Sequence, residues 1–123
     1  MKTLTTAALA MLMAASSLTA QTGTADAAAF WAWRVAGVSW GDTLNVRAYP
    51  SSQSRIQSSY PNGTLLQMTG RCTDGLDLGS IAHLPDHKQR QAVRYRWCEV
   101  WHDPARDGNH VTGWVYGRYI GPA

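Results

Sequence analysis

The chain has 123 residues, 45% of them hydrophobic, and a formal net charge of +3 at pH 7. This length accommodates one small domain. The positive charge is small and spread along the chain, so it does not indicate a nucleic-acid-binding protein, although it suits contact with anionic cell-wall or membrane surfaces.

Residues 1–27 have the composition of a secretory signal peptide. Lys2 gives a positive start, residues 4–15 form a short uncharged apolar run, and small and polar residues follow. The run is too short to span a membrane. Ala-x-Ala motifs predict cleavage after Ala27 or after Ala29; the alternative is an uncleaved amphipathic segment. The sequence therefore predicts an exported protein, periplasmic or secreted, with a single domain at residues 28–123.

Short alternating runs separated by turn residues dominate residues 28–123, and helical periodicity is almost absent. This pattern is typical of a small sheet or barrel. The predicted strands cover residues 31–35, 43–47, 64–69, 94–101 and 110–116. Residues 50–59 are expected to form a polar loop, 61–63 a turn and 118–120 a tight final turn, while Gly70 is expected to end the third strand.

The chain contains two cysteines, Cys72 and Cys98. In an exported chain, two cysteines usually form one disulfide, and we expect that bond here. Closing the long loop between them would stabilise the fold by about 3–4 kcal/mol in the chain-entropy model. A free thiol nucleophile or a metal site is the alternative.

Residues 73–93 interrupt the strand pattern. The segment begins with an Asp-Gly turn, and residues 86–93 are predicted to form a short helix with Pro85 in its first turn. We interpret the segment as an insertion between two strands whose ends the disulfide ties together. Such an excursion is expected to contribute little to the core, so the fold should survive its shortening.

Three short motifs carry a family resemblance: LNVR at residues 44–47 followed by Pro50-Ser51, GWV at 113–115, and RYI at 118–120. Their combination resembles the bacterial SH3-like domain family (SH3b), in a secreted form with a cysteine pair, from about residue 35 to residue 121. The resemblance implies an all-β fold, a small SH3-like barrel of about five strands. The 73–93 insertion would lie between the second and third core strands, where the family usually has a short loop.

The LNVR motif would lead from the first barrel strand into the specificity loop of the family. Alternation predicts that Leu44 and Val46 point inward, while Asn45 and Arg47 face the loop and hold its backbone by hydrogen bonds. Pro50 removes a donor from the ladder and forces the turn.

Six Trp and five Tyr residues exceed what one small core can bury, so some are expected to form a binding surface. If Cys98 and Val100 face inward, Trp97 and Trp101 lie on the outer face. Resemblance to SH3 domains places Trp97 and Tyr119 in a peptide-binding groove. The predicted ligand-binding residues are Arg47, Tyr49, Trp97, Tyr116, Arg118 and Tyr119. Packing is the alternative for each ring; Trp114 is expected in the core, and Trp31, Trp33 and Trp40 around the outside.

Catalytic signals are weak. His83 and His87 are four residues apart, but Pro85 between them argues against a helical metal site, and no nucleophile elbow or phosphate loop is present. We expect a non-catalytic, monomeric binding module without metal, cofactor or nucleic acid, which recognises peptidoglycan or an extended peptide through the aromatic groove. The alternative is a stand-alone protein partner, such as an inhibitor of a cell-wall lytic enzyme, that uses residues 73–93.

Overall fold

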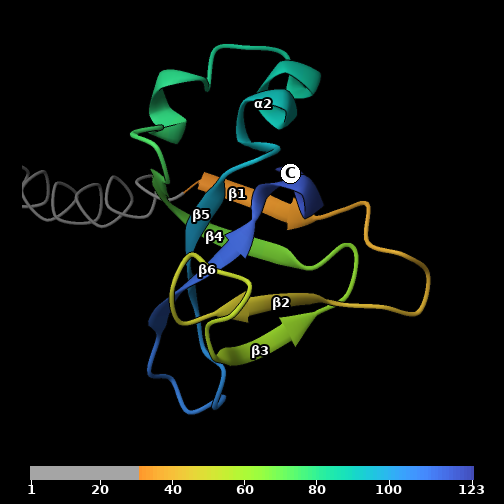
Figure 1. The fold of residues 1–123 in the computed structure, drawn as a ribbon, viewed down its shortest axis with the longest axis vertical. Helices are drawn as coiled ribbons and strands as arrows, with labels where there is room; N and C mark the ends of the chain where they lie inside the picture. Colours follow the sequence, from red (N-terminus) through yellow and green to blue (C-terminus); the bar gives the residue numbers. More distant parts are fainter. Residues whose placement is uncertain (1–30) are drawn as a thin grey trace, which may run out of the picture.

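The computed structural model describes residues 31–123, which form one antiparallel sheet of seven strands and one short α-helix (Figure 1). The predicted signal peptide and its cleavage sites lie outside the described residues. The strands are β1 Trp31–Val35, β2 Leu44–Arg47, β3 Ile56–Tyr60, β4 Leu65–Cys72, β5 Trp97–His102, β6 Val111–Tyr116 and β7 Ile120–Pro122. The helix is α2 Asp86–Val93, and two 3-10 turns are η1 Leu78–Ser80 and η2 Gly117–Tyr119.

The strands follow the order β3-β2-β6-β5-β4-β1-β7 across the sheet. The longest continuous ladder joins β5 to β6, from the pair Trp97–Tyr116 to the pair His102–Val111. The fold is mostly β as predicted, and its sheet has seven strands where about five were expected. The short strand β7 accounts for part of the difference, because it continues the chain beyond the final turn and pairs with β1.

The predicted strands differ from the structure most clearly in three places. The strand β5 begins at Trp97, three residues after the predicted start at residue 94. Residues 56–59 of β3 lie inside the predicted polar loop, and none of the strand's residues is buried, so no apolar alternation marks it. The strand β4 continues through Gly70, which was expected to end it, and its register with β5 shifts between Met68 and Cys72. Gly70 has a φ of +103°, and a Cβ there would lie 2.6 Å from the Trp31 ring, so this glycine permits a bulge with a close ring contact.

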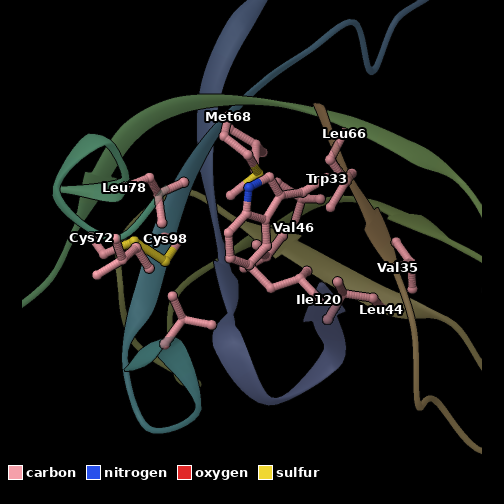
Figure 2. Packing of buried hydrophobic residues seen from close by; sticks show 14 residues of the cluster. Trp33, Val35, Leu44, Val46, Leu66, Met68, Cys72, Leu78, Cys98 and Ile120 are labelled. Atoms are coloured by element: carbon pink, nitrogen blue, oxygen red, sulfur yellow. A yellow bond between two sulfur atoms is a disulfide. The ribbon is translucent and has the colours of Figure 1, made fainter. Parts of the chain in front are cut away.

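The core is a cluster of buried side chains from six of the seven strands and from the segment between β4 and β5. Its members are Trp33, Val35, Leu44, Val46, Leu66, Met68, Cys72, Leu78, Ile81, Val93, Cys98, Val100, Val115 and Ile120 (Figure 2). Leu44, Val46, Cys98 and Val100 point inward as alternation predicted. One tryptophan prediction is wrong, because Trp33 is in the core at 2% exposure. Trp114 is buried as predicted, although it packs outside this cluster.

The disulfide between Cys72 and Cys98 is present, and the two residues are cross-strand partners in β4 and β5. The segment between these strands contains α2 at the predicted residues, with Pro85 at the N-cap position rather than in the first turn. Figure 2 shows Leu78 beside the disulfide. The segment also brings Ile81 into the core, so the prediction that it contributes little to the core is wrong.

The end of α2 fits closely against η2. A Cβ on Gly117 would collide with the backbone carbonyl of Val93, so only glycine permits this approach. Arg96 ties the two ends of the segment together, since its guanidinium donates to the carbonyl oxygens of Ala92 at 3.1 Å and of Thr73 at 2.9 Å. The helix and the C-terminal turn therefore form one packed unit at one end of the sheet (Figure 1).

Candidate binding grooves

Two grooves open on the outer side of the sheet around the loop between β2 and β3. The first groove has a volume of about 680 Å³ and is lined by residues 38–39, 42–45, 47, 50–52, 97, 116 and 119. The second groove has a volume of about 850 Å³ and is lined by residues 48–50, 69–77, 99, 112 and 114. Pro50 belongs to both linings, so the two grooves adjoin at this residue.

Three aromatic rings lie side by side in the first groove. Trp97 and Tyr116 are cross-strand partners on the outer face of β5 and β6, with ring centroids 5.2 Å apart. Tyr119, in η2, follows at 6.4 Å from Tyr116. All three side chains are half-buried, so each ring is supported from behind and keeps part of its surface open to a ligand. Tilted rings at these separations also stabilise one another.

The loop that borders the first groove is held by its own hydrogen bonds. Arg47 Nη1 donates to the backbone oxygen of Ser54 at 2.9 Å, which confirms that Arg47 holds the loop backbone. The Ser54 hydroxyl donates to the carbonyl oxygen of Tyr49 at 3.0 Å and accepts from the Tyr49 amide at 3.1 Å. Because these bonds close the loop on itself, Pro50 is presented to the groove in a defined position.

The connection between β1 and β2 supplies the remaining lining of the first groove. Asn62 fixes its base, because the side-chain amide donates to the Val38 carbonyl at 2.8 Å and accepts from the Val38 amide at 3.0 Å. A turn closed by a bond from Asp42 N–H to the Ser39 carbonyl then exposes Trp40, whose side chain is 99% accessible. Asp42 is the carboxylate of this groove.

The structure brings four of the six predicted binding residues together in the first groove: Arg47, Trp97, Tyr116 and Tyr119. Tyr49 is 70% exposed and lines the second groove instead. Arg118 lies outside both linings, although its guanidinium carbon is 5.9 Å from the centroid of the Tyr119 ring.

Sequence reasoning missed the polar residues Asp42 and Thr43 in the first groove. Thr43 has the same parity as Asn45 and Arg47, opposite to the inward-facing Leu44, so strand alternation contained the signal. Asp42 follows a turn and precedes the strand, and no sequence pattern places its carboxylate in a groove.

Trp114 forms the floor of the second groove. It lies on the outer face of β6, because its neighbour Val115 points into the core, and it is paired with Glu99 of β5. The guanidinium carbon of Arg71 lies 5.5 Å from the centroid of the indole ring. The ring is therefore buried by a cationic side chain and the adjoining loop, which explains why a ring on the outer face is only 9% exposed.

A buried polar network lies outside both groove linings. His102 Nδ1 is 2.9 Å from the Tyr60 hydroxyl, and Nε2 is 2.7 Å from Gln57 Oε1. Since Gln57 Oε1 can only accept, Nε2 carries the proton and Nδ1 accepts from Tyr60. Burial, with a contribution from His110, lowers the pKa of His102, while Asp103 acts in the opposite direction.

Within residues 31–123, no three His, Cys, Asp or Glu side chains gather as metal ligands would. None of the helices in this part of the chain has the length and hydropathy that crossing a bilayer requires. The described residues thus offer grooves lined by aromatic and hydrogen-bonding groups as their candidate sites.

The model of the bacterial SH3 domain family matches residues 42–121, which is more than half of the chain. Comparison with curated proteins and with solved structures found no match. The matched range contains the strands β2 to β6, the disulfide and most of the residues that line the two grooves. Domains of this family are generally binding modules, often for the cell wall, rather than catalysts. The chain belongs to the bacterial SH3 domain family.

Proposed function

We propose that this protein is an exported, non-catalytic binding module that holds the peptide part of peptidoglycan in the first groove. The observation that carries the proposal is the row of half-buried rings formed by Trp97, Tyr116 and Tyr119. Rings supported from behind bind an extended chain with little loss of side-chain freedom, because they are already fixed before the ligand arrives.

The rest of the first groove supports a peptide ligand. Its lining contains the hydroxyl groups of Ser39, Thr43, Ser51 and Ser52 together with the amide of Asn45. Such groups pair with the backbone N–H and C=O groups of an extended chain, while the aromatic rings hold its side chains or carbon skeleton. Export, which the disulfide is compatible with, would bring the module to the cell wall.

The inserted segment is a weaker candidate for a protein-binding surface. Its apolar side chains Leu78, Ile81 and Val93 belong to the core, and the exposed residues of α2 are polar or charged. The buried centre of a protein interface usually needs aromatic or aliphatic anchors, which the exposed face of α2 lacks. We therefore favour the first groove over an inhibitor that acts through residues 73–93.

The test is retention of purified protein on peptidoglycan sacculi, with Trp97→Ala beside the wild type. Loss of an aromatic anchor is expected to weaken binding by about 2 kcal/mol. The fold should remain, because Trp97 is only half-buried and lies outside the core. Trp101→Ala is the matched control: this ring is on the same face of the same strand but outside both groove linings, so retention should be unchanged.

Thermal melting separates a binding defect from unfolding. Trp33→Ala serves as the reference for a core tryptophan and is expected to lose about 3–5 kcal/mol of stability. A Trp97→Ala variant that melts like the wild type and is still fully retained would refute the first groove as the binding site. If the domain instead binds a protein from periplasmic extract and is not retained on sacculi, the result would support the alternative of a protein partner.

A further inference from the structure

We propose that the second groove recognises a diamino-acid side chain that ends in both an ammonium and a carboxylate group. Arg71 would bind the carboxylate and Glu99 the ammonium. The inference rests on the proposed function, since the side chain would belong to the peptide held in the first groove. It adds a second site and a chemical specificity that the first groove does not provide.

The positions of the two grooves suit one continuous ligand. Trp97–Tyr116 in the first groove and Glu99–Trp114 in the second are successive outward-facing pairs of the same β5–β6 ladder. Residues two apart on a strand are about 7 Å apart. A long side chain can span this distance, so a peptide in the first groove can place the end of one side chain over Trp114.

Arg71 has the free hydrogen-bonding capacity that a carboxylate needs. Its guanidinium lies over the Trp114 ring, and no hydrogen bond from the guanidinium nitrogens to another described residue occurs. The one ion pair within 4.0 Å among residues 31–123 joins Arg96 to Asp74, not Arg71 to a carboxylate. The contact with the ring positions the guanidinium while leaving its N–H groups available for a bidentate bond.

The carboxylates of the second groove set the charge that the ligand must carry. The lining contains Asp74, Asp77 and Glu99 against the single Arg71. A ligand end with only a carboxylate would be repelled by three like charges, and one with only an ammonium would leave Arg71 without a partner. An end that carries both groups satisfies both signs, so the groove favours it over either single charge.

Glu99 is the carboxylate best placed for the ammonium. It is half-buried next to Trp114, and Oε1 accepts from the Thr69 hydroxyl at 3.0 Å, which fixes the side chain. Asp77 Oδ1 already accepts from the Gly79 amide, and Asp74 lies 3.8 Å from Arg96. Glu99 thus offers a fixed, partly desolvated acceptor, where an ionic contact is stronger than at an exposed site.

The test compares two kinds of sacculi whose stem peptides carry either diaminopimelate or lysine. In stem peptides that are not cross-linked through this amine, the two residues share the side-chain ammonium and differ by the terminal carboxylate, so the comparison isolates the group assigned to Arg71. We expect about tenfold stronger retention on diaminopimelate sacculi, the scale of a charge-assisted hydrogen-bonded contact. Arg71→Gln should lower this retention to the lysine level and leave retention on lysine sacculi unchanged.

Three further variants make the result specific. Arg94→Gln is the matched control, because Arg94 also lies over an aromatic ring, 5.6 Å from Tyr95, but outside both grooves; it should keep the preference. Glu99→Gln should weaken retention on both kinds of sacculi, since both present the ammonium. Trp97→Ala should weaken both equally, because it acts in the first groove.

Equal retention of the wild type on the two kinds of sacculi would overturn the inference while leaving the proposed function intact. A preference that survives Arg71→Gln, in a variant that melts like the wild type, would overturn it as well. If the wild type is retained on neither kind of sacculi, the proposed function and the inference are refuted together.

Discussion

Two long connections in this domain behave in opposite ways. Residues 48–55, between β2 and β3, contain no buried residue and are held by hydrogen bonds such as that of Arg47 to Ser54. Residues 73–96, between β4 and β5, place Leu78 and Val93 in the core. The first connection borders both grooves, so its residues can serve ligand contact without disturbing the core. The second is part of the folding unit.

The same contrast extends to the strands and turns that these connections reach. The strand β3, which follows the first connection, has no buried residue and is joined to β5 through the polar contacts of Gln57 and Tyr60 with His102. The second connection packs α2 against η2 by close backbone contact at Gly117. The polar contacts of β3 include the titratable His102, so their contribution to stability depends on pH, whereas that of apolar packing does not. The two ends of the domain should therefore fail under different conditions.

The largest effect is expected from replacing residues 74–93 with a short Gly-Ser loop. Removal of Leu78, Ile81 and Val93 takes three side chains from the core, each worth about 2–5 kcal/mol when a residue of this size is truncated. Their sum approaches or exceeds the whole stability of a small domain. Circular dichroism should show no cooperative melting. A Gly-Ser replacement of residues 49–53 with equal length is the control and should melt cooperatively.

Reduction of the Cys72–Cys98 bond is expected to remove about 3–4 kcal/mol of stability, because the bond closes a long loop in the unfolded chain. Urea denaturation with and without reductant measures the difference. Alkylation of the native, unreduced protein should add no mass, since no free cysteine occurs among residues 31–123. An unchanged denaturation midpoint after complete reduction would contradict the predicted role of the bond.

Gly117→Ala tests the packing between α2 and η2. The new methyl group would collide with the Val93 carbonyl and lie 2.9 Å from that of Arg96. Because both are backbone atoms, relief requires the helix end to move, and we expect a loss of about 3 kcal/mol. Gly79→Ala is the matched control, since the nearest atom to its new methyl group would be a carbon of the Trp31 ring at 3.4 Å. This substitution should change stability by less than about 1 kcal/mol.

Those parts of the fold with a local signal were predictable from the sequence. The apolar alternation of β2 and β5 placed Val46 and Val100 in the core, and a proline followed by polar helix-forming residues marked α2. The strand β3 carried no such signal, because none of its side chains is buried and its side-chain contacts to β5 are polar and join residues far apart in the sequence. Leu78 and Ile81 were missed for a related reason: they lie in a segment without periodicity, and only the approach of distant strands buries them.

Tryptophan placement shows the same limit. Alternation separates the two faces of β1, but it does not tell which face meets the core, so Trp33 was assigned to the wrong side. Trp114 is buried on the outer face through Arg71, which comes from a different strand. The ring row of the first groove was predictable because strand parity and the family resemblance agreed on Trp97. The second groove depends on pairing between β4, β5 and β6, which no local pattern contains.

The polar anchor of β3 predicts a smaller, pH-dependent effect. Burial lowers the pKa of His102 from its usual value of about 6.5, so the unfolded chain binds a proton at a higher pH than the folded one. Stability should therefore fall as the pH drops from 6.5 through the lower pKa of the folded state. His110, Asp103, Tyr60 and Gln57 are the polar groups that face or influence the ring.

Urea denaturation between pH 7 and pH 5 checks this prediction. His102→Gln removes the titrating group and should flatten the fall in stability relative to the wild type. His87→Gln, on the exposed face of α2, is the control and should keep the wild-type slope. The prediction fails if the His102 variant and the wild type lose stability in parallel.

The smallest stability effect is expected for Ser54→Ala, and here binding should change more than folding. The substitution removes the two hydrogen bonds between the Ser54 hydroxyl and the backbone of Tyr49, in a loop without buried residues. A loss of about 1 kcal/mol or less is expected from such exposed bonds. The freed loop must then be ordered by the ligand, so retention on sacculi should weaken by a similar free energy.

Ser59→Ala is the matched control, because this exposed serine of β3 lies outside both grooves and should change neither stability nor retention. A Ser54→Ala variant with unchanged retention would show that the loop is ordered without its hydroxyl bonds, or that the ligand does not touch Pro50. Substitution of Pro50 by Ala separates these outcomes, since Pro50 contacts both grooves. A ligand that touches this loop should respond to both changes.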